Sequence, residues 1–119
     1  MIGLWVNAGK TRAMIESQFN DLVDQTFDAV ELALDDVDAD VDYEVSGGVL
    51  TVDFDNGTTM IFSRQPPTRQ LWLAARSGGY HFTWDETAGD WRNTRSGELL
   101  RPFVVEQMRS QADVVFAWK

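Results

Sequence analysis

Nine carboxylates stand between residues 24 and 44 of this chain, and no Lys or Arg stands among them. Carboxylate oxygens are the ligands that hard cations such as Fe²⁺, Fe³⁺, Mn²⁺ and Ca²⁺ prefer. The chain has no cysteine and one histidine, which excludes zinc–thiolate sites and cysteine-ligated clusters. Because open carboxylates do not form a closed cage, we expect weak, exchangeable, multi-site metal binding. The candidate ligands are Asp24, Asp28, Glu31, Asp35, Asp36, Asp38, Asp40, Asp42 and Glu44.

The negative charge is confined to one part of the chain. Residues 13–63 contain thirteen of the nineteen acids and no Lys or Arg, whereas the other residues contain all ten basic residues and six acids. The two parts therefore carry −13 and +4, which sum to the net charge of −9. A pI near 4.3 speaks against nucleic acid as a partner, because phosphate contacts need clustered Lys and Arg. It favours cations or a basic protein surface, although a solvated acidic face that only aids solubility is the alternative.

Sequence periodicity indicates which elements position the acids. Residues 15–35 predict an amphipathic helix, and the alternation of acid and apolar residues from 36 to 42 predicts a strand or an extended lead-in to one. The acids of that extended stretch all fall on one side. The apolar side of the helix comprises Phe19, Leu22, Val23, Thr26, Val30 and Leu34, and the acidic side comprises Asp21, Asp24, Asp28, Glu31 and Asp35.

Short strands joined by turns follow the acidic stretch. We expect strands over 49–54, 59–63, 70–75 and 80–84 and a short one around Trp91, with Asp55-Asn56-Gly57 as a hairpin turn. A second helix follows, with Ser96 as its N-cap, and the residues after 112 form an uncertain tail. The fold class is α+β: a two-layer sandwich with the N- and C-terminal helices on one face of an antiparallel sheet of five to seven strands. We expect one domain over 14–119 and a disordered extension over 1–13.

A second candidate surface lies on the predicted sheet. Trp72 falls on the strand face opposite Leu71 and Leu73, and an exposed Trp is typical of an interaction anchor. Gln65 and Gln70 could flank it as polar contacts, while burial of Trp72 under neighbouring side chains is the alternative. His81 is the only histidine of the chain, and a lone histidine more often has a structural role than that of a ligand. No nucleophile–base arrangement is evident, so we do not expect an enzyme.

Five segments of the sequence resemble the frataxin family, and most of all its bacterial branch. They are residues 46–57 (SGGVLTVDFDNG), 64–66 (RQP), 70–74 (QLWLA), 78–82 (GGYHF) and 95–98 (RSGE), and the resemblance covers roughly Glu16 to Ala112. The resemblance implies the same sandwich, iron (Fe²⁺ or Fe³⁺) bound by the acidic first helix and first strand, and a role in iron–sulfur cluster assembly. The implied partners are the cysteine desulfurase and the cluster scaffold protein. The sequence departs from the family pattern in two places. The junction between the first helix and the first strand, residues 35–40, is shorter, and Ser63 stands where an Asn is common on the sheet surface.

Three functions remain open at this point. The leading hypothesis is an iron-binding adaptor or regulator of iron–sulfur cluster assembly that holds no cluster of its own and is a monomer without metal. The second is a ferroxidase that stores iron by self-assembly. The third is an acidic protein-binding module with incidental metal binding. No apolar run approaches the roughly 18 residues of a membrane helix, and the opening residues lack the charge order of a secretory signal, so we expect a cytoplasmic protein.

Overall fold

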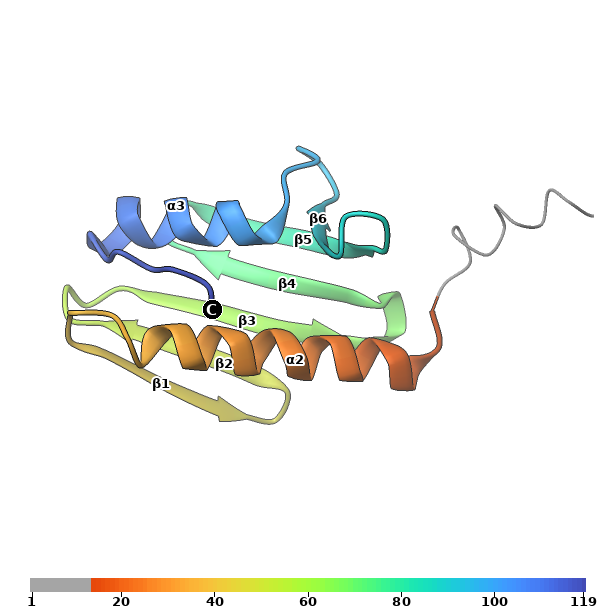
Figure 1. Ribbon diagram of the computed structural model, residues 1–119, viewed down its shortest axis with the longest axis horizontal. Helices are drawn as coiled ribbons and strands as arrows, with labels where there is room; N and C mark the ends of the chain where they lie inside the picture. The colour runs from red at the N-terminus through yellow and green to blue at the C-terminus, as the bar shows by residue number, and fades with distance from the viewer. Residues whose placement is uncertain (1–13) are drawn as a thin grey trace, which may run out of the picture.

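The computed structural model describes residues 14–119 as two layers, a sheet and a pair of helices (Figure 1). The predicted extension over residues 1–13 lies outside the described residues. Both predicted helices and all the predicted strands are present, and the predicted fold class is confirmed. In chain order the elements are α2 (Glu16–Leu34), β1 (Val41–Ser46), β2 (Val49–Phe54), β3 (Thr59–Gln65), the 3₁₀ turn η1 (Pro66–Thr68), β4 (Gln70–Ala75), β5 (Gly78–Asp85), β6 (Asp90–Asn93) and α3 (Leu100–Ala112).

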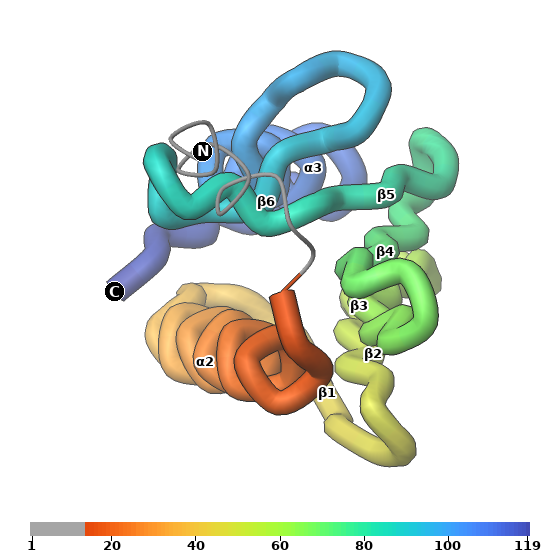
Figure 2. Tube along the Cα trace, turned by 90° about the vertical axis from the view of Figure 1, so that its right-hand side faces the viewer, coloured from red at the N-terminus to blue at the C-terminus, as the bar shows by residue number. Residues whose placement is uncertain are grey.

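The six strands pair in chain order, each antiparallel to the next. Viewed nearly along the strands, the sheet bends between β4 and β6, and both helices lie on its inner side (Figure 2). The β2–β3 hairpin turns at Asn56-Gly57, as predicted, with Gly57 at a φ of 86° that disfavours other residues. The side-chain oxygen of Asn56 accepts a hydrogen bond from the amide of Thr58 at 3.0 Å and so holds the turn.

The hydrophobic core lies between the sheet and the two helices. Residues at helical spacing on α2 and alternate residues on the strands are buried against one another, as the periods of 3.6 and 2 require. The fully buried members are Phe19, Val23, Val30, Leu50, Val52, Met60, Phe62, Leu71, Phe82, Val104 and Met108. No helix within residues 14–119 combines the length and the apolar character needed to cross a membrane.

The connection between α2 and β1 differs from the sequence prediction. The helix agrees within one residue at each end, but the strand expected from residue 36 onward begins at Val41. The amide of Asp36 bonds the carbonyl of Ala33 at 3.1 Å, and the amide of Val37 bonds that of Leu34 at 3.2 Å. These short-range bonds continue the helix end as a turn, so residues 36–40 are not paired in the sheet.

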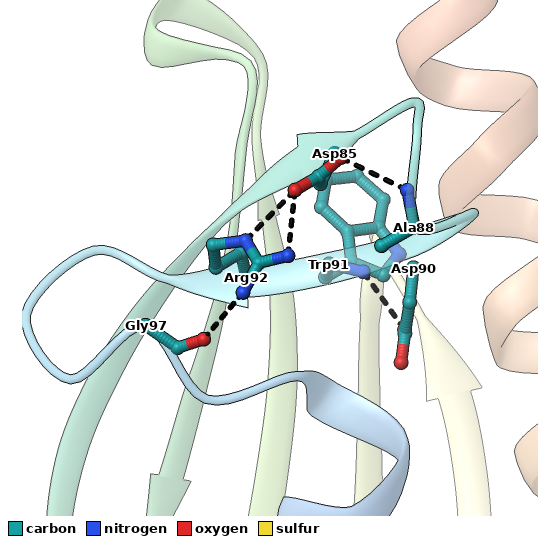
Figure 3. A network of polar contacts seen from close by, with 6 residues as sticks. All are labelled: Asp85, Ala88, Asp90, Trp91, Arg92 and Gly97. Atoms are coloured by element: carbon teal, nitrogen blue, oxygen red, sulfur yellow. Dashed lines mark hydrogen bonds and ion pairs between the residues drawn. The ribbon is translucent and has the colours of Figure 1, made fainter.

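The start of α3 also differs. Ser96 was predicted as its N-cap, but the helix begins at Leu100, and the hydroxyl of Ser96 accepts a bond from the amide of Glu98 instead. The buried carboxylate of Asp90 takes over the role of a cap, because one of its oxygens accepts the amide of Arg101 at 3.0 Å. Its other oxygen accepts the amide of Trp91 at 2.8 Å (Figure 3). The helix is therefore capped from β6, across space, rather than from its own leading turn.

The residues after α3 are part of the core. The chain turns back from the end of α3 and runs between the two helices (Figure 1). Val114 and Phe116 are buried, and the indole of Trp118 donates to the carbonyl of Arg101 at 2.9 Å. The stretch left as an uncertain tail thus fills the space between α2 and α3.

Candidate functional site

The nine acids occupy three successive segments. The helix acids are Asp24, Asp28 and Glu31 on α2 together with Asp35, the C-cap residue that follows it; the turn acids are Asp36, Asp38 and Asp40; and the strand acids are Asp42 and Glu44 on β1. We call the three groups together the acidic surface. All nine are exposed except Glu31, which is partly buried. Eight of the nine candidate ligands are therefore open to solvent.

The helix acids repel one another at the C-terminal end of α2. Burial, followed by the charges of Asp28 and Asp35, raises the pKa of Glu31. The hydroxyl of Tyr43 on β1 donates to a carboxylate oxygen of Asp35 at 2.8 Å, which raises the pKa of Tyr43. The last turn of α2 has no basic residue, and the helix dipole is negative there. This end of α2 therefore favours any incoming cation.

Two of the nine acids have cationic partners that the sequence pattern did not reveal. Arg64 on β3 forms an ion pair with Asp24 at 2.5 Å and also donates to Asn20 at 3.0 Å. Lys119, at the other end of the described chain, forms an ion pair with Asp36. Both cations are far from their acidic partners in the sequence and meet them only in the folded chain. The other seven acids of the acidic surface have no ion pair within residues 14–119: Asp28, Glu31, Asp35, Asp38, Asp40, Asp42 and Glu44.

The strand acids point away from the helix acids. In the β1–β2 register Asp42 is opposite Asp53, Tyr43 opposite the buried Val52, and Glu44 opposite Thr51. Since Tyr43 packs toward the core, its two neighbours face outward, on the side of the sheet without helices. Within residues 14–119, no three Asp, Glu or His side chains converge as a metal cage would require. Iron binding by the nine predicted residues stays a prediction.

The predicted partner contacts lie on that same outer face. Trp72 pairs with Ser63 on β3 and with His81 on β5, and its indole ring stacks on the His81 imidazole at 4.2 Å with 7° between the planes. The indole N–H donates to the side chain of Gln70 at 2.8 Å, and Gln70 pairs with Gln65. The three predicted residues are thus brought together.

Trp72 is half-buried rather than fully exposed, because His81 covers one of its faces. Sequence reasoning treated His81 as structural and missed this stack. The alternation of polar and apolar residues along β4 and β5 places Trp72 and His81 on the outer side of their strands. Their pairing also depends on the register between the two strands, which the alternation does not determine. The outer face therefore presents an aromatic pair with amide groups beside it.

Comparisons with known proteins agree with this architecture. A family model described as a frataxin-like domain matches residues 12–114. The chain belongs to the frataxin family. A relative from Ectopseudomonas mendocina, named iron-sulfur cluster assembly protein CyaY, is 52% identical over 105 residues that cover 85% of this chain and 96% of the relative. The resemblance inferred from the five sequence segments is confirmed.

Solved structures of frataxin-family members have the same fold as this frataxin-family chain. Frataxin from Psychromonas ingrahamii superposes with a TM-score of 0.82 at 33% identity, covering 89% of this chain and 99% of that one. Trimeric frataxin from the yeast Saccharomyces cerevisiae, complexed with ferrous iron, has a TM-score of 0.62 at 30% identity and covers 86% and 89%. The ferrous complex belongs to the yeast protein.

Proposed function

We propose that this frataxin-family chain serves iron–sulfur cluster assembly in the cytoplasm as an iron-binding adaptor that docks on a cysteine desulfurase. Its bacterial relatives carry the name of cluster assembly proteins rather than of enzymes. The observation that carries the proposal is that seven of the nine acids of the acidic surface, on α2, the turn and β1, have no ion pair within residues 14–119. A cation or a basic protein surface offsets that negative charge. In the proposed role the cation is iron and the basic surface belongs to the desulfurase.

Iron binds first, in this proposal, at the end of α2 near Asp28, Glu31 and Asp35. The like charges at i,i+3 and i,i+4 repel, so a bound cation relieves an existing cost. Oxygen ligands on an open surface suit Fe²⁺ and Fe³⁺ and hold them weakly and exchangeably. Asp24 and Asp36 contribute less, because iron would first have to displace Arg64 and Lys119.

The desulfurase contacts the acidic surface through a basic patch in this proposal. Asp42 and Glu44 share the outer sheet face with Trp72, Gln65 and Gln70, so one partner can touch both regions without reaching around the sheet edge. The stacked Trp72 supplies apolar area, and the glutamines supply hydrogen bonds. Because the iron ligands and the desulfurase contacts belong to the same acidic surface, iron and the desulfurase influence each other's affinity.

Binding to the desulfurase with and without Fe²⁺ tests the proposal. The triple variant Asp28→Asn, Glu31→Gln, Asp35→Asn removes three charges from the acidic surface. The matched control Asp55→Asn, Glu86→Gln, Glu98→Gln removes three exposed charges that lie outside the acidic surface. We expect the first variant to lose affinity for the desulfurase and the influence of iron on it, and the control to keep both. Equal losses in the two variants would show that only net charge matters and would refute docking by this surface.

A second candidate function is ferroxidase activity coupled to iron storage by self-assembly. The observation that favours it is the trimeric ferrous complex of the yeast relative. It predicts oxygen consumption and growth in particle size when Fe²⁺ is added in air, both abolished in the same triple variant. A chain that stays monomeric and consumes oxygen no faster than free Fe²⁺ contradicts this candidate and leaves the adaptor proposal in place.

A further inference from the structure

A cavity of about 140 Å³ lies on the other side of α2 from the helix acids. Its walls come from the middle of α2, the β5–β6 turn, the start of α3 and the segment after α3. It is the meeting point of elements far apart in sequence, including the tail that closes the space between the helices (Figure 1). None of the nine acids of the acidic surface lines it, so the cavity is separate from the proposed iron and desulfurase contacts.

Three tryptophans form most of the aromatic wall. Trp84 and Trp91 meet edge to face, with ring centroids 5.3 Å apart, and Trp118 closes another side. The indole N–H of Trp91 donates to the hydroxyl of Thr26 at 2.9 Å, and that of Trp118 donates to the carbonyl of Arg101. Because these donors already have acceptors, the two rings offer the cavity apolar surface.

One charge stands at this cavity with no acidic partner. The exposed guanidinium of Arg101 lies over the ring of Trp118 at 5.2 Å, and it has no ion pair or side-chain hydrogen bond to any residue in 14–119. The other charged lining residue, Asp90, is buried and has both oxygens engaged by the amides of Trp91 and Arg101. The lining charge that has no partner among residues 14–119 is therefore the positive charge of Arg101.

We propose that this cavity binds a single aromatic ring that carries a carboxylate. A cavity of about 150 Å³ with apolar walls is sufficient for benzene, so the volume here fits one ring. The ring lies among the tryptophans, where edge and face contacts favour aromatic over aliphatic groups. The carboxylate pairs with the Arg101 guanidinium, whose planar fork matches its two oxygens.

The test uses benzoate as the probe and the indole N–H resonances as reporters. Titration of the full chain is followed by two-dimensional ¹⁵N NMR. We expect saturable shifts at Trp84, Trp91 and Trp118 in the millimolar range that such a small ligand allows. Trp72 lies on the outer sheet face and is the internal control, because a site-specific ligand leaves its resonance in place. Absence of saturable shifts, or equal shifts at Trp72, would overturn the proposal.

Three variants separate the charge from the cavity. Arg101→Gln should weaken benzoate roughly tenfold, the loss of one charge-assisted pair, while neutral benzyl alcohol binds as before. Arg95→Gln removes an exposed charge from the loop before α3 that does not line the cavity, and it should leave benzoate unchanged. Ala29→Met fills the cavity from α2 and should abolish binding of both probes. Equal effects of the two arginine variants, or unchanged binding to Ala29→Met, would contradict the proposed site, with no bearing on the acidic surface.

Discussion

Glu31 and Asp24 occupy the same side of one helix, yet their surroundings give them different properties. Asp24 is held by Arg64, whereas Glu31 is partly buried between Asp28 and Asp35 with no cation beside it. A stripe of acids on a helical wheel therefore does not predict equal affinity for a cation. A bound cation gives the largest stabilisation to the carboxylate whose ionised form is least stable in the folded chain. That carboxylate is Glu31, so we expect cations to bind at the Glu31 end of the helix acids.

Glu31→Gln should stabilise the folded chain by about 0.5 kcal/mol at pH 7 and low salt, the repulsion of two like-charge pairs. The pKa of Glu31 is raised on folding, so the folded state holds its proton more tightly than the unfolded state does. Its ionisation therefore costs stability as the pH rises from the ordinary value of 4.5 through the raised folded value. Urea unfolding at several pH values checks this.

The gain from Glu31→Gln should disappear below that pH window and shrink in high salt. Glu86→Gln, in the exposed β5–β6 turn, is the control and should change stability little. A gain for Glu31→Gln that persists undiminished under acidic conditions would show that repulsion among carboxylates is not its cause.

Among the elements, those set by local periodicity were predicted well and those set by tertiary contacts were not. The apolar side of α2 predicted its bounds within one residue, and Asn56-Gly57 predicted the β2–β3 hairpin. The cap of α3 was missed because Asp90 lies ten residues before the helix on another strand. The nine candidate acids can be named from the sequence, and metal binding by them stays a prediction. The Arg64 partner of Asp24 could not be predicted, because β3 meets α2 only in the fold.

Asp90→Ala should destabilise the chain by about 1–2 kcal/mol, because it removes the oxygen that accepts the Arg101 amide at the start of α3. Ser96→Ala is the matched test of the sequence-based alternative, and it should cost at most a few tenths of a kcal/mol. Chemical unfolding of both variants measures the difference. The reverse order of effects would restore Ser96 as the cap.

Phe116→Ala should cost about 3 kcal/mol or more, because Phe116 is buried between the two helices although it lies outside any helix or strand. Its neighbour Val115 is 84% exposed, so Val115→Ala should be nearly neutral. Thermal and urea unfolding of the pair checks whether the segment after α3 belongs to the core. Equal stabilities would mean that this segment is dispensable for the fold.

At the scale of the whole molecule, the acids that are clustered in the sequence lie on α2, β1 and the turn between them. The segment with thirteen acids and no basic residue includes α2, β1 and β2, and the basic residues lie in the rest of the chain. The fold turns two of those cations back onto the acidic surface through Arg64 and Lys119. The seven acids of the acidic surface other than Asp24 and Asp36 have no ion pair within residues 14–119, and they are the basis of the proposed iron and desulfurase binding.

An anaerobic Fe²⁺ titration followed by NMR tests that proposal most directly, because paramagnetic iron broadens resonances near its binding site. We predict that the resonances of residues 28–44 broaden first, with the strongest effect around Glu31 and Asp35, and that the triple variant Asp28→Asn, Glu31→Gln, Asp35→Asn loses this early broadening. The matched triple variant at Asp55, Glu86 and Glu98 should keep it. Early broadening elsewhere in the chain, or broadening of residues 28–44 that survives the triple substitution, would contradict iron binding at the acidic surface.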